Sequence, residues 1–286
     1  MLRLLNVARV RCCSTLTAAA DPLTAPFAPC VSETGERILY PSHKPTTLSQ
    51  RLVLTFGSCY MALTDTKRDD MVAVFGETTG HTALQSMRKR MLEDPTGREI
   101  LSEKPRITTN TVDLDYLRTL PEDTFGKHYI NFMDKYKLTP DARAKVKYVD
   151  DTELGYLMQR YREVHDLAHV INGMGIGYVV WCTNTCLIII SRLLGEIMIK
   201  WFEAIQTGLP MCVLAALGAP AKLTPVQKDV FRYKLLPWAI SNGWYGKFYM
   251  SVYFEKHWEQ PMESFRRELN LTAPPFETFE HTEPVY

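Results

Sequence analysis

The residues best suited to chemistry lie within a single helical turn, in the stretch HDLAH at residues 165–169. His165 and His169 are four residues apart, so on a helix they share one face, and Asp166 lies about 100° further round. Imidazole and carboxylate groups that converge in this way can hold a divalent metal ion. A fourth ligand has to come from another element, and Glu196 opens the next helix-like segment. The spacing therefore predicts a metal site with the ligands His165, Asp166, His169 and Glu196.

The segment that must position the two histidines runs from residue 151 to 174. Its apolar residues recur at helical spacing: Leu154, Leu157, Met158, Tyr161, Val164, Ala168 and Ile171. On a helical wheel this stripe centres about 50° from His165, which places the histidine pair at the border of the core. A half-buried histidine needs a polar partner, because its desolvation is costly. Two hydrogen-bonded histidines that bind no metal are the simpler alternative, and the Glu of the H-E-x-x-H zinc protease signature is absent.

The composition excludes some classes of protein. The net charge is +1, so the basic footprint of a nucleic-acid-binding protein is missing. Hydrophobic residues make up 46% of 286 positions, which is enough for one large domain or two small ones. The seven cysteines are scattered and odd in number. Such a set is typical of a reducing compartment and not of a disulfide framework.

The two ends of the chain are expected to lie outside the folded domain. Residues 1–20 contain three arginines and no acidic residue, with leucines, valines and a Ser/Thr/Ala-rich end. This make-up predicts a disordered mitochondrial transit peptide; an ordinary basic tail is the alternative. Residues 21–44, rich in Pro and Thr, predict a linker, and residues 276–286 a short tail.

Residues 45–275 predict a single multi-helix, all-α domain. Helical spacing of apolar residues recurs along this stretch, and Val- and Ile-rich alternating runs bounded by hairpin turns are scarce. No apolar run reaches the ~20 residues of a membrane-spanning helix, so contact with a membrane is expected to be peripheral. Residues 207–221 carry no charge, which predicts either a buried core helix or a wall for an apolar ligand such as a prenyl lipid.

Several long phrases resemble the coenzyme Q four family of ubiquinone-biosynthesis proteins. They are DDMVAVFGETTGH (69–81), YVDDTELGYLMQRYREVHDLAHV (148–170) and LGEIMIKWFEAIQTGLPMC (194–212). The resemblance covers roughly residues 45–275. The metal motif of the family is similar to His-Asp-x-x-His, then eleven residues, then Glu, and His165, Asp166 and His169 match it directly.

The resemblance implies an all-helical, zinc-binding protein on the matrix side of the mitochondrial inner membrane. It implies partners as well: the other enzymes of a coenzyme Q biosynthetic complex and the membrane surface. The sequence leaves open whether a second copy of the chain is a further partner. The implied reaction removes the C1 carboxylate from a 4-hydroxy-3-methoxy-5-polyprenylbenzoate, with or without oxidation at C1. Glu77 and His81, in another family phrase, then become candidates for acid–base groups near the metal, unless they only pack or cap a helix.

One departure from the family pattern lies inside the motif. His169 and Glu196 are separated by 26 residues, and removal of the 15 residues Ile176–Ile190 (IGYVVWCTNTCLIII) restores the spacing of eleven. We interpret this apolar, β-prone insert as a retained intron or a gene-model error; a genuine lineage-specific loop is the alternative. Cys182 and Cys186 within it have no second pair to complete a zinc site.

Two functions of other classes compete with the decarboxylase. The first is a scaffold that binds prenyl lipid and organises the biosynthetic enzymes around a structural metal ion. The second is a metal phosphohydrolase of the His-Asp type, which needs a further histidine and aspartate in the same site. His128 and Asp229 are available for that role, but neither lies in a supporting motif.

Overall fold

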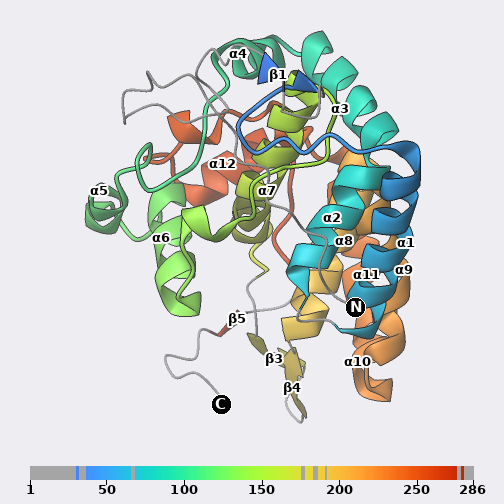
Figure 1. Cartoon of the computed structure of the whole chain (residues 1–286). Coiled ribbons are helices and arrows are strands. Elements are labelled where there is room, and N and C mark those ends of the chain that lie inside the picture. Colours follow the sequence, from blue (N-terminus) through green and yellow to red (C-terminus); the bar gives the residue numbers. More distant parts are fainter. Residues whose placement is uncertain are drawn as a thin grey trace.

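The structure, a computed structural model, describes residues 30–31, 37–65, 68–174, 178–182, 186–190, 192–275 and 278–279. The predicted transit peptide and nearly all of the predicted tail lie outside these residues. Figure 1 shows helices packed around one central helix, with the few strands at the periphery. The prediction of an all-α domain is confirmed.

The helices follow one another along the whole described chain. In order, they are α1 (Leu48–Thr64), α2 (Asp69–Thr79), α3 (His81–Glu93), α4 (Pro95–Glu103), α5 (Leu114–Thr119), α6 (Phe125–Tyr136), α7 (Thr152–Ile171), α8 (Arg192–Thr207), α9 (Pro210–Gly218), α10 (Pro225–Val230), α11 (Leu236–Tyr245) and α12 (Met262–Glu268). A π-helical turn, Phe231–Leu235, joins α10 to α11. None of the described helices is both long and apolar enough to cross a bilayer.

The central helix is α7, which carries the HDLAH stretch. Asp151 caps its N-terminus by accepting hydrogen bonds from the backbone N–H groups of Glu153 and Leu154, as an N-cap aspartate does. Every residue from Leu154 to Ile171 is buried, because α3 and α6 pack against different parts of the helix. A helix buried on all sides must pair its charged residues internally.

Three buried ion pairs meet this requirement on α7. Arg160 pairs with Glu255, Arg162 with Glu77, and Glu163 with Arg106, at nitrogen–oxygen distances of 2.8, 2.6 and 2.6 Å. Each pair joins α7 to a different part of the chain. The ion pairs therefore help to fix how α7 sits among its neighbours.

The second element of the site is α8, which packs mainly against α11 and α9. Buried apolar residues of α8, among them Leu194, Ile197, Met198 and Phe202, form the contact face. Glu196, Lys200 and Glu203 follow at a spacing of three to four residues, so these three polar side chains share another face of α8.

The predicted insert forms an antiparallel hairpin between α7 and α8. Its strands are β3 (Tyr178–Cys182) and β4 (Cys186–Ile190), with Tyr178 opposite Ile190. The short strand β5 (Thr278–Phe279) pairs with the other edge of β3, giving the order β4-β3-β5. Figure 1 shows the hairpin projecting below α8, so the surplus residues leave the helical domain instead of separating α7 from α8.

The folded domain includes residues ahead of Pro45, within the stretch for which the sequence predicts a linker. Strands β1 (Cys30–Val31) and β2 (Arg37–Ile38) pair antiparallel. Tyr40 is buried and donates a hydrogen bond to the carbonyl of Val149, 2.9 Å away. A Pro/Thr-rich composition could not reveal this long-range contact.

Candidate metal centre

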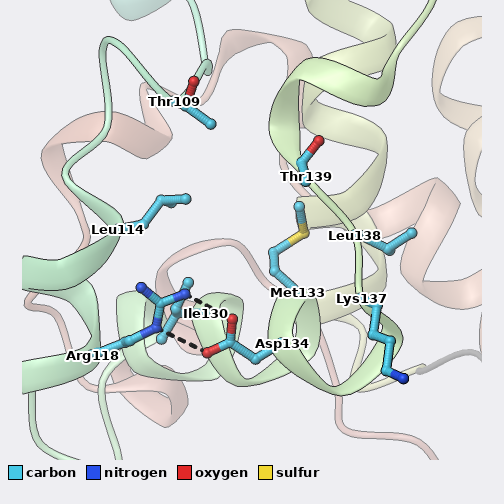
Figure 2. Close-up of a pocket in the computed structure, with 9 residues that line it drawn as sticks. All are labelled: Thr109, Leu114, Arg118, Ile130, Met133, Asp134, Lys137, Leu138 and Thr139. Atoms are coloured by element: carbon cyan, nitrogen blue, oxygen red, sulfur yellow. Dashed lines mark hydrogen bonds and ion pairs between the residues drawn. The ribbon is translucent and has the colours of Figure 1, made fainter.

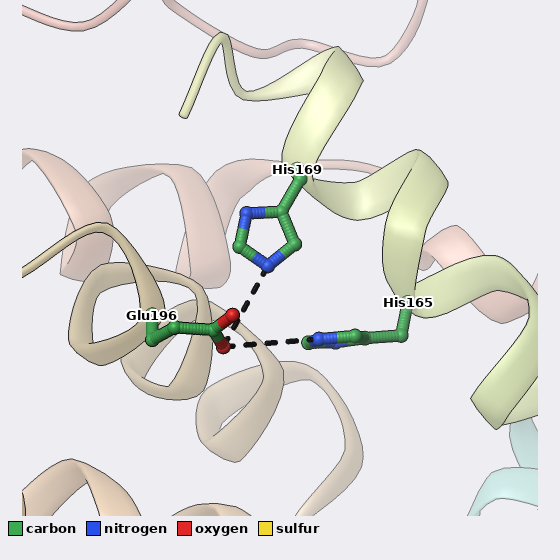
Figure 3. Close-up of side chains that lie close together, drawn as sticks. All are labelled: His165, His169 and Glu196. Carbon is green, nitrogen blue, oxygen red and sulfur yellow. Dashed lines mark ion pairs between the residues drawn. The ribbon is translucent and has the colours of Figure 1, made fainter. Parts of the chain in front are cut away.

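Three of the four predicted ligands come together between α7 and α8. One ligand atom each from His165, His169 and Glu196 lies within 4.8 Å of the others. Figure 3 shows the two imidazoles projecting from α7 toward the Glu196 carboxylate on α8. The 26-residue separation does not prevent the approach, because the hairpin takes up the additional residues.

His169 is oriented by a backbone carbonyl at the end of its own helix. Its Nδ1 lies 2.6 Å from the carbonyl oxygen of Met174. A carbonyl only accepts hydrogen bonds, so Nδ1 carries a proton, and in the neutral ring Nε2 presents its lone pair. This Nε2 is buried without a hydrogen-bond partner, and it lies 3.8 Å from the Glu196 carboxylate, too far for a hydrogen bond.

His165 is oriented by a second glutamate instead of a carbonyl. Its Nδ1 lies 2.6 Å from the carboxylate of Glu203, and its Nε2 lies 4.0 Å from Glu196. The ionised carboxylate can only accept, so Nδ1 again donates and Nε2 again presents its lone pair. The two rings are nearly perpendicular, with an interplanar angle of 85°.

The donor set fits a divalent metal ion such as zinc. The two Nε2 atoms and one carboxylate oxygen surround a common point, and each Nδ1–H is held by an acceptor, as is usual for metal-ligating histidines. The Nε2 of His169, which is buried and has no hydrogen-bond partner, also favours a metal ion, because a buried polar atom without a hydrogen bond is costly. Three protein ligands leave a coordination position for water or substrate, which is the arrangement of catalytic zinc sites.

Burial and neighbouring charges together shift the pKa values of these three groups. Burial raises the pKa of Glu196, but His169 and then His165 outweigh this effect and hold it well below its usual range. Burial lowers the pKa of His169, yet the Glu196 carboxylate together with the Met174 carbonyl raises it above its ordinary value. The pKa of His165 is lowered, because burial dominates over the nearby Glu203. A metal ion binds the deprotonated ligands and therefore competes with a proton on His169.

Asp166 takes a different partner from the one that the sequence predicts. Its buried carboxylate makes two hydrogen bonds to the guanidinium of Arg143, one from Nε at 3.3 Å and a shorter one from Nη2. It lies next to the site but outside the group of three converging ligands. Arg143 is about one-third exposed, so its guanidinium brings a positive charge to the edge of the site.

Glu77 and His81 lie apart from the three ligands. Glu77 is buried, pairs with Arg162 and accepts hydrogen bonds from the backbone N–H groups of Lys147 and Tyr148. It thereby ties α2 to the segment that leads into α7. His81 is exposed at the first position of α3. The packing and capping roles that the sequence left open fit these positions better than acid–base roles.

The other candidate groups do not join the site. His128 and Asp229 are exposed and lie outside the converging group in the described chain. The side chains of Cys182 and Cys186 lie outside what the structure describes. A hollow of about 370 Å³ lies between α5 and α6, where Arg118 pairs with Asp134, and no predicted ligand lines it (Figure 2).

Sequence reasoning missed the groups that hold the ligands. Glu203 lies seven residues after Glu196, and Lys200 lies between them, which is the spacing of one helix face. This periodicity was the available signal. Arg143 precedes α7 in an irregular segment, so no periodic pattern connects it to Asp166.

Comparison with known proteins identifies the family. The family described as "Coenzyme Q (ubiquinone) biosynthesis protein Coq4" matches residues 40–275. The mitochondrial ubiquinone biosynthesis protein COQ4 homologue of Bos taurus is 45% identical over 254 residues, 89% of this chain and 89% of its own. The Homo sapiens homologue is 46% identical over 241 residues, covering 84% and 85% of the two chains. The chain belongs to the Coq4 family.

The Coq4 fold is also found in a solved bacterial structure. A Nostoc punctiforme protein, provisionally described as a ubiquinone biosynthesis protein, superposes with a TM-score of 0.56 at 20% identity. The match covers 77% of this Coq4 chain and 96% of the bacterial one. At this identity the likeness concerns the fold alone. Membership of the Coq4 family supports a role in ubiquinone biosynthesis.

Proposed function

We propose that this Coq4 protein is a carboxy-lyase that removes the C1 carboxylate of a 4-hydroxy-3-methoxy-5-polyprenylbenzoate. A divalent metal ion, zinc, would be held by His165, His169 and Glu196, with Asp166 of the same motif as the fourth ligand. The observation that carries the proposal is the buried, unpartnered Nε2 of His169, which faces a second imidazole and a carboxylate. The family's place in ubiquinone biosynthesis supplies the pathway.

The chemistry follows from the para-hydroxyl group of the substrate. A proton adds at C1, the bond from C1 to the carboxylate breaks, and CO₂ leaves while the bonding electrons return to the ring. A divalent ion held by these residues would supply Lewis acidity toward a carboxylate or phenolate oxygen. The protein supplies orientation, because Met174 and Glu203 hold the two histidine rings.

The exchange of one carboxylate would open the metal for substrate. In the structure the Asp166 carboxylate is paired with Arg143. Arg143 and a metal ion would therefore be alternative partners of the Asp166 carboxylate. With Asp166 on Arg143, a bound ion would have three protein ligands and could also take up water or substrate; with Asp166 as a fourth ligand, the ion would suit a structural role. We assign the open arrangement to catalysis.

The polyprenyl tail of the substrate connects the site to a membrane. Each buried methylene group contributes about 0.8 kcal/mol, so the tail needs an apolar path between bilayer and protein. We place the protein on the matrix side of the mitochondrial inner membrane as a peripheral protein. There it would act beside the other coenzyme Q biosynthesis enzymes, in keeping with the mitochondrial naming of its relatives.

The deciding experiment is a decarboxylation assay with purified protein and a prenylated 4-hydroxy-3-methoxybenzoate. We expect CO₂ release that depends on zinc, is removed by a chelator and is restored by added metal. Analysis of the ring product distinguishes a hydrogen from a hydroxyl at C1 and so separates simple from oxidative decarboxylation. Metal-loaded protein that binds the substrate and releases no CO₂ would contradict the proposal.

A prenyl-lipid scaffold is the second candidate, favoured by one feature. Helix α1 exposes several large apolar side chains, among them Val53, Phe56 and Tyr60. An exposed apolar face of this kind marks a site that contacts a lipid or a protein. Binding of prenylated benzoate together with partner enzymes, without turnover, would favour the scaffold.

A further inference from the structure

Glu203 is a buried carboxylate that the proposed reaction does not use. It lies on α8, two helical turns after Glu196, and its side chain is fully shielded from solvent. An isolated charge in such a place is strongly destabilising, so its partners must account for its presence.

Both oxygens of the Glu203 carboxylate are engaged. One oxygen accepts from Nδ1 of His165 at 2.6 Å. The other accepts from the Tyr161 hydroxyl and from Nζ of Lys200, each at 2.8 Å. The Cys212 thiol lies 3.7 Å from the second oxygen. The carboxylate thus contacts four polar groups from three helices: His165 and Tyr161 on α7, Lys200 on α8 and Cys212 on α9.

These contacts fix the orientation of the Glu203 carboxylate relative to His165. Tyr161 and Lys200 hold one oxygen, which leaves the other aimed at His165 and no freedom for the carboxylate to turn away. The His165 ring is thereby fixed with Nδ1–H toward Glu203 and the Nε2 lone pair toward Glu196. His169 receives the same orientation from a neutral carbonyl, whereas His165 receives it from a carboxylate.

The two acceptors differ in what they do to the ring. A carboxylate on Nδ1–H makes the imidazole a stronger electron donor at Nε2 than a carbonyl does, and such partners typically change metal affinity 10- to 100-fold. Lys200 supplies the compensating positive charge that allows the carboxylate to stay buried.

We propose that Glu203 is a positioning residue of the metal centre, which fixes the orientation and tautomer of His165 and is itself fixed by Tyr161 and Lys200. The inference rests on the proposed metal site. It adds a group that touches neither the metal nor the substrate.

The experiment compares Glu203→Gln with a matched control in the full chain. Glu163→Gln is the control, because Glu163 is also buried and ion-paired, but with Arg106. Zinc affinity is measured by competition with a chelator, and the protonation of the His165 ring by ¹⁵N NMR of the metal-free protein. We expect Glu203→Gln to weaken zinc binding about 10- to 100-fold and to alter the His165 signals. Glu163→Gln keeps an oxygen for Arg106 and the Ile107 N–H, so it should lower stability but leave the zinc affinity and the His165 signals of the folded protein near the wild-type values.

A milder variant keeps the test decisive if Glu203→Gln does not fold. Tyr161→Phe removes one hydrogen bond to the carboxylate and preserves the ring packing. It should weaken zinc binding several-fold. Unchanged affinity and unchanged His165 signals in a folded Glu203→Gln or Tyr161→Phe protein would overturn the proposal. A wild-type protein that binds no zinc would instead refute the metal site, while the NMR measurement would still report on Glu203 and His165.

Discussion

His165 and His169 are the side chains on which the proposed metal site depends most directly. Replacing either by alanine removes one of two imidazole ligands, so we expect loss of stoichiometric zinc from a protein that keeps its helical content. His81→Ala is the matched control, since this histidine is exposed at the start of α3. Elemental analysis of purified, folded variants measures the effect. Full zinc retention in both histidine variants would show that the ion binds elsewhere.

At the scale of residues, the sequence reveals ligands better than the groups that hold them. The i, i+4 spacing of His165 and His169 predicts a shared face, and the structure shows it. Their Nδ1 partners, Met174 and Glu203, depend on how α7 ends and how α8 docks. The spacing of Glu196, Lys200 and Glu203 marks a shared face of α8, but it does not show that this face meets His165, because that contact depends on tertiary docking. The pairing of Asp166 with Arg143 has the same origin.

At the scale of elements, Glu77 links α2 to α7 through its ion pair with Arg162. Glu77→Ala would leave the buried Arg162 guanidinium without its carboxylate, and breaking one side of a buried ion pair costs about 3–5 kcal/mol. We expect a loss of that order in the free energy of unfolding, measured with denaturant. Glu77→Gln, which keeps an oxygen for two backbone N–H groups, should lose less.

Measurements on the folded molecules of the Glu77 variants distinguish a structural role of Glu77 from a catalytic one. Zinc affinity and turnover per folded molecule should stay near the wild-type values. Normal stability combined with lost turnover would mean that Glu77 acts in the reaction, and the assignment of a packing role would then be wrong.

Deletion of the β3–β4 hairpin is expected to leave α7 and α8 in place, because its strands project away from the helices. Lengthening the connection from 11 to 26 residues costs only about 0.8 kcal/mol of loop-closure entropy. The composition of the insert matters more, because an apolar β-prone segment promotes aggregation. We expect the protein lacking Ile176–Ile190 to give more soluble material and to bind zinc more tightly. Soluble yield and chelator competition, measured on both versions side by side, test this.

The origin of the hairpin is a separate question with its own measurement. Sequencing the transcript across codons 170–196 should yield a message without the codons for Ile176–Ile190. A message that always carries them, together with equal affinity and yield of the two proteins, would identify the insert as a tolerated natural loop.

At the scale of elements, periodicity predicted most of the fold. Apolar spacing over residues 151–174 predicts α7, and Asp151 fits its N-cap. Two features required the structure. The insert pairs with β5, in which Phe279 lies opposite Val179, and the predicted linker contributes Tyr40 to the core. Both depend on contacts between distant segments, which composition does not specify.

The mitochondrial targeting signal of the protein is predicted to lie in residues 1–20, outside the described structure. This segment combines Arg3, Arg9 and Arg11 with no acidic residue, so fusion to a fluorescent reporter should direct it to mitochondria. Changing the three arginines to glutamate should abolish import, as judged by microscopy and fractionation. Normal import of the charge-reversed reporter would remove the basis for the targeting prediction.

Among the described elements, α1 is the one best suited to contact a membrane, because it turns apolar residues outward and polar residues inward, the reverse of an ordinary surface helix. Its polar residues Arg51 and Ser58 face the protein, where Arg51 bonds to Asp150 and Ser58 is buried. Val53 and Phe56 are 73% and 72% exposed. The helix contains no acidic residue, so nothing on it repels the anionic surface of a bilayer. We expect this face to lie on the lipid headgroups.

Val53→Glu combined with Phe56→Glu should therefore weaken binding of the full chain to vesicles that contain anionic lipid. Flotation with the vesicles measures binding, and the stability and zinc content of the variant should match the wild type, since neither side chain is buried. Leu92→Glu, at a half-exposed leucine of α3, is the control and should bind normally. Undiminished flotation accompanied by a smaller molecular mass in solution would instead show that α1 contacts a second copy of the chain.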